Sequence, residues 1–173
     1  MALTDSSVMP WMVKNPGPIV ENTWKGDSSS TYAHGQLLKK SVAGTVVPVT
    51  AGHATHGIHA IFEDADQTAT DTGGFVTIRE ITEETRFMVQ LHHTTGSSAV
   101  ATQAMIGDQY EIDVADTTDY IWTVDLEATT NADVEITDIW DNSMDFDTSS
   151  DASGNFGLVE VKITPNKIDN VPA

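Results

Sequence analysis

Three histidines at a spacing of three, His53, His56 and His59, are the first residues of the chain that could do chemistry. Imidazoles are good zinc ligands, and three of them suit a catalytic tetrahedral site. The spacing would place them on one face of a helix, but Gly57 and the preceding Val47-Pro48-Val49 disfavour a helix. On a strand, an odd spacing sends alternate side chains to opposite faces. We therefore interpret them as solvated loop histidines, although a loop could still gather them.

An acidic run is the second candidate, because carboxylate oxygens are the ligands that calcium prefers. Its members are Asp141, Asp145, Asp147 and Asp151. Counted as an EF-hand loop from Asp145, position six is Ser150 where glycine is required, and position twelve is Phe156 where glutamate is expected. We expect a solvated loop and no bound metal, with a calcium loop of another kind as the alternative.

Motifs of the common enzyme classes are absent from the sequence. There is no glycine-rich nucleotide loop, no Gly-x-Ser-x-Gly elbow and no His-Glu-x-x-His. Adjacent acids such as Glu83 and Glu84 carry no specific signal, because pairs arise by chance among 26 acidic residues. The chain has no cysteine, which excludes disulfides, thiolate metal sites and cysteine nucleophiles. We expect a protein that is not an enzyme and needs no cofactor.

The charge of the chain excludes further classes of partner. Its 173 residues carry 26 Asp and Glu against 8 Lys and Arg, a formal net charge of −18. Nucleic acids and anionic membranes are bound through Lys and Arg, so neither is an expected partner. No apolar stretch approaches the roughly 20 residues of a membrane helix, and no secretory leader is visible, so we expect synthesis in the cytoplasm. The cations are uneven: none lies between Arg86 and Lys162.

Short runs that alternate apolar and polar residues predict an all-β fold, a small barrel or sandwich of about eight short strands. The expected strands are 36–41, 45–49, 57–62, 75–81, 86–91, 119–127, 133–140 and 158–163. Clusters of Gly, Asn, Asp, Ser and Thr separate them, as turns require. A short helix is expected only within residues 98–106.

The ends of the chain are expected to differ from its middle. Residues 1–35 contain Pro, Gly and Ser breaks and predict an extended N-terminal arm, residues 36–165 a β domain, and residues 166–173 a C-terminal tail. Disordered linkers are poor in aromatics, so Trp11 and Trp24 indicate that the arm docks on a surface. That surface is either another protein or the chain's own domain. In the first case, the β domain should fold without residues 1–30.

The order of these segments resembles the head decoration (cement) proteins of tailed bacteriophages and related small virion proteins. The resemblance lies in the run from Ala33 to Ala51 (AHGQLLKKSVAGTVVPVTA), which closes on Gly57-Ile58. It continues in FMVQ at 87–90, MIGDQYEI at 105–112, WTVD at 122–125, VEITD at 134–138 and GLVEV at 157–161.

The resemblance implies a viral structural protein that binds the outer surface of a phage capsid and stabilises it. It implies the major capsid protein as partner, a homo-oligomer that is commonly a trimer, and the arm as the main contact. The capsid-binding residues would be Trp11, Lys14, Trp24, Lys25, Lys39 and Lys40. A tail location would leave much the same sequence signature.

A secreted β-sandwich that binds calcium or carbohydrate is the alternative. Its support is the acidic run together with Tyr120, Trp122 and Trp140, since aromatic rings often line sugar sites. In an alternating strand, however, Tyr120 and Trp122 share one face with Val124, and that face is equally expected to be core.

Overall fold

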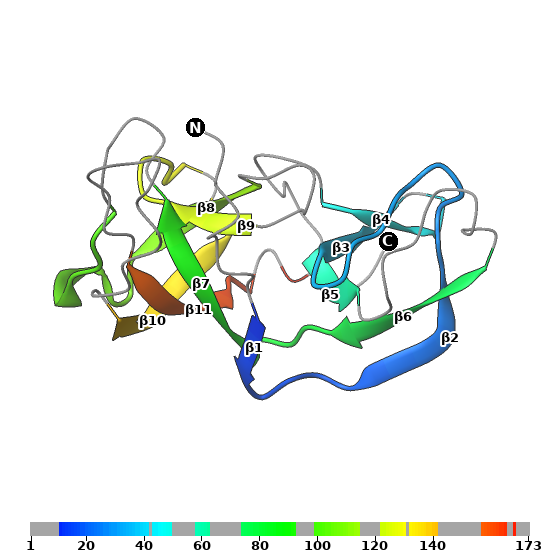
Figure 1. Cartoon of the computed structure of the whole chain (residues 1–173), viewed down its shortest axis with the longest axis horizontal. Coiled ribbons are helices and arrows are strands. Elements are labelled where there is room, and N and C mark those ends of the chain that lie inside the picture. Colours follow the sequence, from blue (N-terminus) through cyan, green and yellow to red (C-terminus); the bar gives the residue numbers. More distant parts are fainter. Residues whose placement is uncertain are drawn as a thin grey trace, which may run out of the picture.

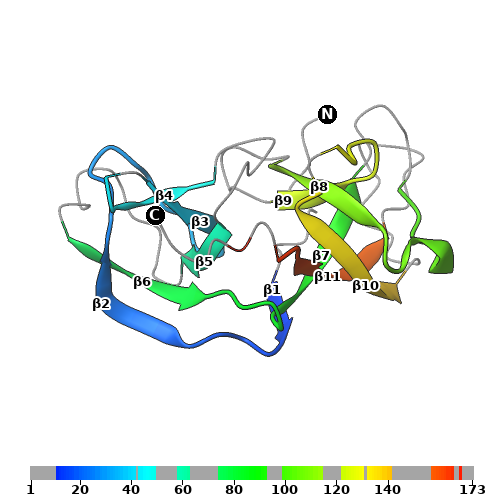
Figure 2. The same cartoon turned by 180° about the vertical axis from the view of Figure 1, so that it is seen from behind.

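The protein is all-β, as the alternation of its sequence predicts. The computed structural model describes residues 11–41, 43–49, 58–62, 74–92, 99–114, 122–130, 132–141, 157–165 and 168. These residues form eleven strands and one short 3₁₀ helix, Gln103–Met105, which lies within the segment expected to be helical. The strands form two sheets that lie side by side (Figure 1), and the view from behind shows the same arrangement (Figure 2).

The first sheet closes into a five-stranded barrel. Its strands are β7 (Arg86–His92), β11 (Leu158–Ile163), β10 (Val134–Asp141), β8 (Gln109–Val114) and β9 (Trp122–Asp125). Neighbours in this order are antiparallel, and the ring is closed by a parallel pairing of β9 with the end of β7, where Leu91 lies opposite Val124. The short strand β1 (Trp11–Lys14) pairs antiparallel with the beginning of β7. We call the five closed strands the barrel.

The second sheet, which we call the small sheet, is nearly closed in the same way. Its order is β2 (Ile19–Lys25), β6 (Phe75–Glu80), β5 (Ile58–Phe62), β3 (Leu37–Lys40) and β4 (Val46–Pro48). Gly44, with a φ of 76°, lies in the β3–β4 turn, a conformation that favours glycine. A single parallel bridge between Gly26 and Val46 brings the end of β2 against β4.

Two hydrophobic clusters follow from the alternation of the strands. In the barrel, Phe87, Val89 and Leu91 of β7 face inward with the apolar residues of β8 to β11. The cluster of the small sheet contains Leu38, Val46, Val76 and Ile78 with Tyr32. Leu37 and Val49, which flank the β3–β4 hairpin, belong to the barrel cluster. The two sheets therefore share core residues.

Within the described residues, the chain passes between the sheets twice, and the two passages bind each other. One is residues 15–18, between β1 and β2; the other is residues 80–85, from the last residue of β6 to the residue before β7. The Glu80 amide donates to the Pro18 carbonyl (3.1 Å), and the Thr85 hydroxyl donates to the Asn15 carbonyl (3.1 Å). Gly17 is buried here, and a Cβ at this position would lie 1.8 Å from the Glu80 carbonyl oxygen. We call these two passages the crossover.

The segment expected to be an arm is, over its described part, built into both sheets. β1 adds to the barrel and β2 to the small sheet. The sequence left two docking surfaces open, another protein or the chain's own domain. The described part of this segment docks on the chain's own domain. The first sheet strand thus lies well before residue 36, and removing residues 1–30 would delete two strands rather than free a β domain. Proline and glycine at 16–18 interrupted the alternation, and each strand is too short or too irregular to show a clear period. Residues 1–10 and 169–173 lie outside the described residues.

Candidate interaction surface

The six residues expected to bind a capsid divide into two groups in the structure. Trp11 and Lys14 lie in β1 on the barrel, whereas Trp24, Lys25, Lys39 and Lys40 lie in β2 and β3 of the small sheet. The backbone of Trp11 pairs with that of Met88, and its side chain lies outside the described part. The six residues are therefore divided between the two sheets.

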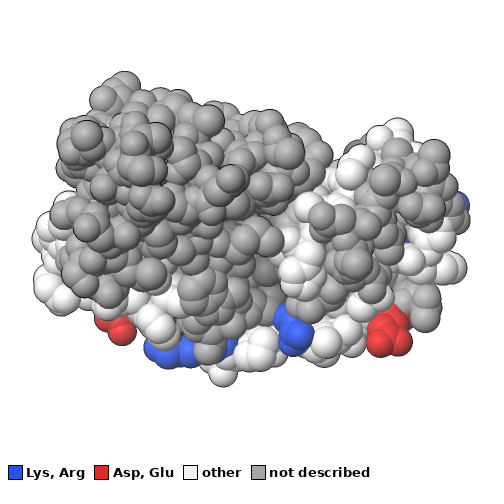
Figure 3. Space-filling model, viewed as in Figure 1, with Lys and Arg blue, Asp and Glu red and all other residues white. Residues whose placement is uncertain are grey.

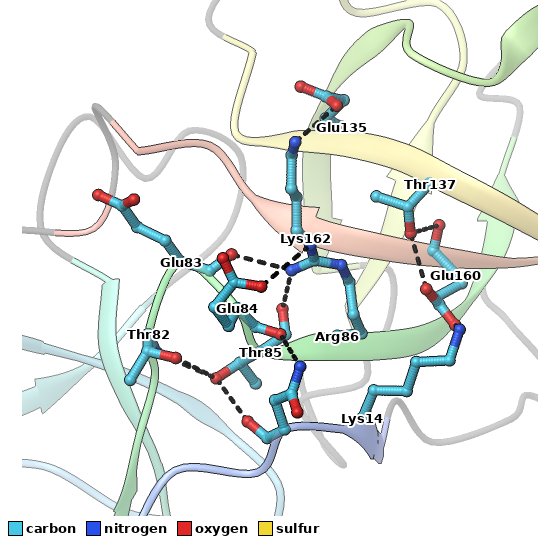
Figure 4. Close-up of polar contacts among 11 residues, drawn as sticks. Lys14, Thr82, Glu83, Glu84, Thr85, Arg86, Glu135, Thr137, Glu160 and Lys162 are labelled. Atoms are coloured by element: carbon cyan, nitrogen blue, oxygen red, sulfur yellow. Dashed lines mark hydrogen bonds and ion pairs between the residues drawn. The ribbon is translucent and has the colours of Figure 1, made fainter.

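Lys14 is held by the barrel itself. Its Nζ lies 2.7 Å from Oε2 of Glu160, a carboxylate whose side chain is only 4% exposed. The Thr137 hydroxyl donates to the other oxygen of Glu160 at 3.0 Å (Figure 4). A buried carboxylate without a cation would be costly, so Lys14 has a structural role at this position. Its binding to a capsid stays a prediction, made for a lysine whose ammonium group is already paired within the chain.

The other two cations of the described barrel are also paired. Lys162 Nζ lies 2.7 Å from Oε1 of Glu135, and Gln109 donates to the second oxygen of that carboxylate. The hydrogen bond from Lys162 is the main cause of a lowered pKa of Glu135, since it stabilises the charged form. Arg86 donates to the Glu83 carbonyl at 2.8 Å and lies 3.9 Å from the carboxylate of Glu84 (Figure 4).

Trp24 and Lys40 contact each other in the small sheet. Lys40 Nζ lies 3.8 Å from the centre of the Trp24 ring, a cation–π contact. Trp24 is half-buried and packs against the cluster of the small sheet, so it serves its own domain rather than standing free as an anchor. Lys25 is exposed and Lys39 half-buried, and neither makes an ion pair in the part of the chain that the structure describes.

The charges separate between the two sheets. Among described residues, positions 15–80 carry four Lys or Arg and three Asp or Glu, whereas the remaining positions carry three cations and twelve acids. All three cations of the second group are in the ion pairs described above. Figure 3 shows one face, on which basic and acidic side chains both lie along the lower edge, the acidic ones toward its two ends, and a further basic side chain lies at the right edge. Among the described residues, the lysines that make no ion pair therefore lie on the small sheet, and the acid excess lies on the barrel.

The candidate metal ligands are only partly described. His53, His56, Asp145, Asp147 and Asp151 lie outside the described residues, and His59 and Asp141 are described only in their backbone. Among side chains that the structure does describe, no three His, Asp or Glu residues are arranged to hold a metal ion. His92 is buried at the end of β7, and its Nδ1 lies 3.8 Å from Oδ2 of Asp113.

The aromatic residues that suggested a sugar site do not form one in the described part. Trp122 is 1% exposed and packs edge-on against Phe87, with 5.5 Å between the ring centres. Trp122 is a core residue, which agrees with the expectation that the strand face it shares with Val124 is core. Trp140 is 51% exposed at the end of β10, and Tyr120 lies outside the described residues.

Two important polar residues could not be recognised from the sequence. Glu160 alternates with apolar residues and looks solvent-facing, yet it is buried by the fold around β1. Tyr32 lies in the expected arm but is fully buried. Its hydroxyl donates to the Val46 carbonyl (2.6 Å) and accepts from the Asp27 amide (2.6 Å). Burial is the main cause of the raised pKa of Tyr32. The one feature of the sequence that could have indicated the burial of Tyr32 is the presence of an aromatic residue inside a polar, turn-rich segment.

Within the described residues, no helix has the length and apolar character needed to cross a bilayer. A scan against models of protein families finds no family that matches this chain. A search of curated proteins likewise finds no match.

Proposed function

We propose that the chain is a structural protein of a tailed phage virion that binds the outer surface of the capsid and stabilises it, with no catalytic activity. The separation of charge is the observation that carries this proposal. Every cation of the described barrel is neutralised within the molecule, whereas lysines of the small sheet are not. A protein that coats a shell needs one side that adheres and another that stays soluble through repulsion.

The strands support the same proposal. The segments that resemble decoration proteins form β3 and β4 of the small sheet and β7 to β11 of the barrel. Two small, joined β bodies offer broad surfaces for docking on a repeating lattice. Repetition on such a lattice converts modest single contacts into high avidity. The resemblance adds self-association, commonly as a trimer, and a location on the outer capsid surface.

The capsid contacts that we propose are fewer than those suggested by the sequence. Lys25, Lys39 and Lys40 remain, together with residues 1–10, which precede β1 and lie outside the described part. Lys14 and Trp24 belong to contacts within the chain. The proposed orientation places the small sheet toward the capsid and the barrel outward.

Co-sedimentation with purified expanded capsids tests the proposal. The full chain should saturate the capsids at a fixed number of copies per capsid subunit and raise the temperature at which they break open. The variant lacking residues 1–10 keeps all eleven described strands and should bind more weakly. Analytical ultracentrifugation of the free protein measures self-association. A full-length, folded chain that does not bind capsids would refute the proposal.

A further inference from the structure

The barrel is closed by a short parallel contact between β7 and β9, which we call the seam. Within the described residues, two residue pairs make up its register, Leu91 with Val124 and His92 with Asp125. The Leu126 amide also donates to the His92 carbonyl at 3.1 Å. Because so few backbone pairs hold this contact, we expect the side chains beside it to affect how firmly the barrel is closed.

His92 is a buried side chain at the seam whose hydrogen-bonding groups are unsatisfied. Leu91 belongs to the barrel core, so the alternation of β7 places His92 on the outer face of the barrel. The residue is nevertheless only 4% exposed, and neither ring nitrogen has a hydrogen-bond partner in the part of the chain that the structure describes. A neutral imidazole carries one donor and one acceptor nitrogen, and leaving them unpaired in a buried position costs free energy. The neutral ring therefore weakens the seam.

Carboxylates of the two neighbouring strands face this ring. Asp113 of β8 makes the closest described approach, with its Oδ2 3.8 Å from Nδ1 of His92. Asp125 of β9 is the register partner of His92, and Glu111 of β8 is the register partner of Asp125. Since side chains two residues apart share a face, all three acids lie on the same outer face as the ring.

The other described charges near β7 are engaged elsewhere. Glu160 of β11 shares the outer face, but it lies opposite Met88, four residues before His92, and is paired with Lys14. Arg86, at the opposite end of β7, donates to backbone carbonyls of the residues before the strand. Among the described residues, the titratable groups that face His92 are therefore the three carboxylates of β8 and β9.

Protonation changes the contact between His92 and Asp113. Because β9 lies between β7 and β8, the two side chains meet across β9, where Thr123, the register partner of Asp113, is fully buried. A neutral ring at 3.8 Å makes no hydrogen bond with the carboxylate, whereas an imidazolium attracts it as a cation and can donate from both nitrogens. Burial opposes the charge, but the Asp113 side chain is 32% exposed and two further carboxylates lie on the same face.

We propose that His92 and Asp113 form a pH-sensitive contact: in mild acid the protonated ring pairs with the carboxylate and holds the seam closed, and deprotonation releases the pair. An imidazole gains its charge between about pH 5 and 8, so the contact responds within this range. Its contribution to stability is present where the ring is charged and is lost as the pH rises. This inference goes beyond the proposed function and does not depend on whether the chain binds capsids.

Hydrogen exchange of the Leu126 amide, followed by NMR at about pH 5.5 and about pH 8, tests the inference, because this amide bonds to the His92 carbonyl across the seam. Its protection factor, corrected for the intrinsic pH dependence of exchange, should be about fivefold or more higher in acid for the parent chain. Asp113→Asn removes the charge at nearly constant size, and its partly exposed position should let the variant fold. This variant should lose the rise in protection.

The matched control is Asp108→Asn, which changes the net charge by the same amount. Asp108 is exposed, and its carboxylate lies 3.5 Å from the Tyr110 hydroxyl rather than beside His92. The control should keep the rise in protection that the parent shows.

Urea unfolding of His92→Gln gives a second measurement, because glutamine does not titrate. Its midpoint should fall relative to the parent by more at about pH 5.5 than at about pH 8. An equal rise in protection in the parent and in Asp113→Asn, or no rise in the parent, would overturn the inference. Loss of the rise in Asp108→Asn as well would attribute it to overall charge and likewise overturn the inference. If His92→Gln does not fold, the comparison of the two aspartate variants still decides the question.

Discussion

Replacement of Gly17 by alanine tests whether the crossover joins the two sheets as the structure shows. The new Cβ would lie 1.8 Å from the Glu80 carbonyl oxygen, whereas real Cβ contacts essentially never fall below 3.0 Å, so the two passages must separate by about 1.2 Å. That separation strains the bond from the Glu80 amide to the Pro18 carbonyl. Overpacking of this kind costs about 1–3 kcal/mol, and a weakened hydrogen bond adds about 1 kcal/mol. We expect the free energy of unfolding to fall by about 2–4 kcal/mol.

Urea unfolding followed by tryptophan fluorescence measures this change, because Trp122 is buried in the barrel. With a slope of about 2 kcal/mol per molar urea, the midpoint should fall by about 1–2 M. Gly74→Ala is the matched control, since a Cβ there meets nothing within 4 Å. The control should change the unfolding free energy by less than about 0.5 kcal/mol. Equal midpoints for the two variants would show that the crossover is not packed as described.

Three further predictions concern polar contacts and the barrel core. Lys14→Ala leaves the buried Glu160 without its cation and should cost about 1–3 kcal/mol in urea unfolding, less than for a fully buried pair because Lys14 is half exposed; no change would remove the structural role given to this lysine. Glu135 has a lowered pKa in the folded state, so it stabilises the fold above its ordinary pKa and this contribution is lost as the pH falls through the folded value. The difference in unfolding free energy between the parent and Glu135→Gln should therefore be present at neutral pH and vanish in strong acid, and a difference independent of pH would contradict the ion pair. Trp122→Ala should lower the free energy of unfolding by about 3–5 kcal/mol, measured by thermal unfolding, because it leaves a cavity in the barrel core. A decrease no larger than that caused by a substitution at an exposed position would place Trp122 outside the core.

Much of the fold could be predicted because alternation reports burial directly. In β11, Val159, Val161 and Ile163 are inward and buried, as a period of two requires. Trp122 and Val124 follow the same rule in β9. The pairings that close the barrel could not be read in the same way. The parallel contact of β9 with β7 joins segments that only the assembled fold brings together, and no local pattern encodes such a partner.

The interaction surface was only partly predictable, because residue type does not show how a side chain is engaged. Lys14 and Lys25 look alike in the sequence, yet one neutralises a buried carboxylate and the other is exposed without an ion pair in the described part. The difference follows from pairing: β1 places Lys14 beside the barrel, where Glu160 lies on β11. Tryptophans in a proline-rich segment indicated docking, and Trp24 does dock, but on its own small sheet.

Among the described residues, the uneven placement of charge gives the acid excess a purpose that the total charge does not show. Net charge keeps a protein soluble, and an acid excess on one body also defines which side can approach an acidic partner. At physiological ionic strength the screening length is about 8 Å, so an exposed lysine is governed more by charges within that distance than by charges farther away. A molecule with net charge −18 can on this account still adhere to an acidic surface through one end.

We propose that the small sheet attaches this protein to the outside of a phage capsid. Cryo-electron microscopy of expanded phage capsids incubated with the purified protein tests this proposal most directly. The account predicts added density on the outer surface, with the small sheet against the capsid and the acidic barrel outward. Capsids without added density, or density with the barrel against the capsid and the small sheet in solvent, would contradict it.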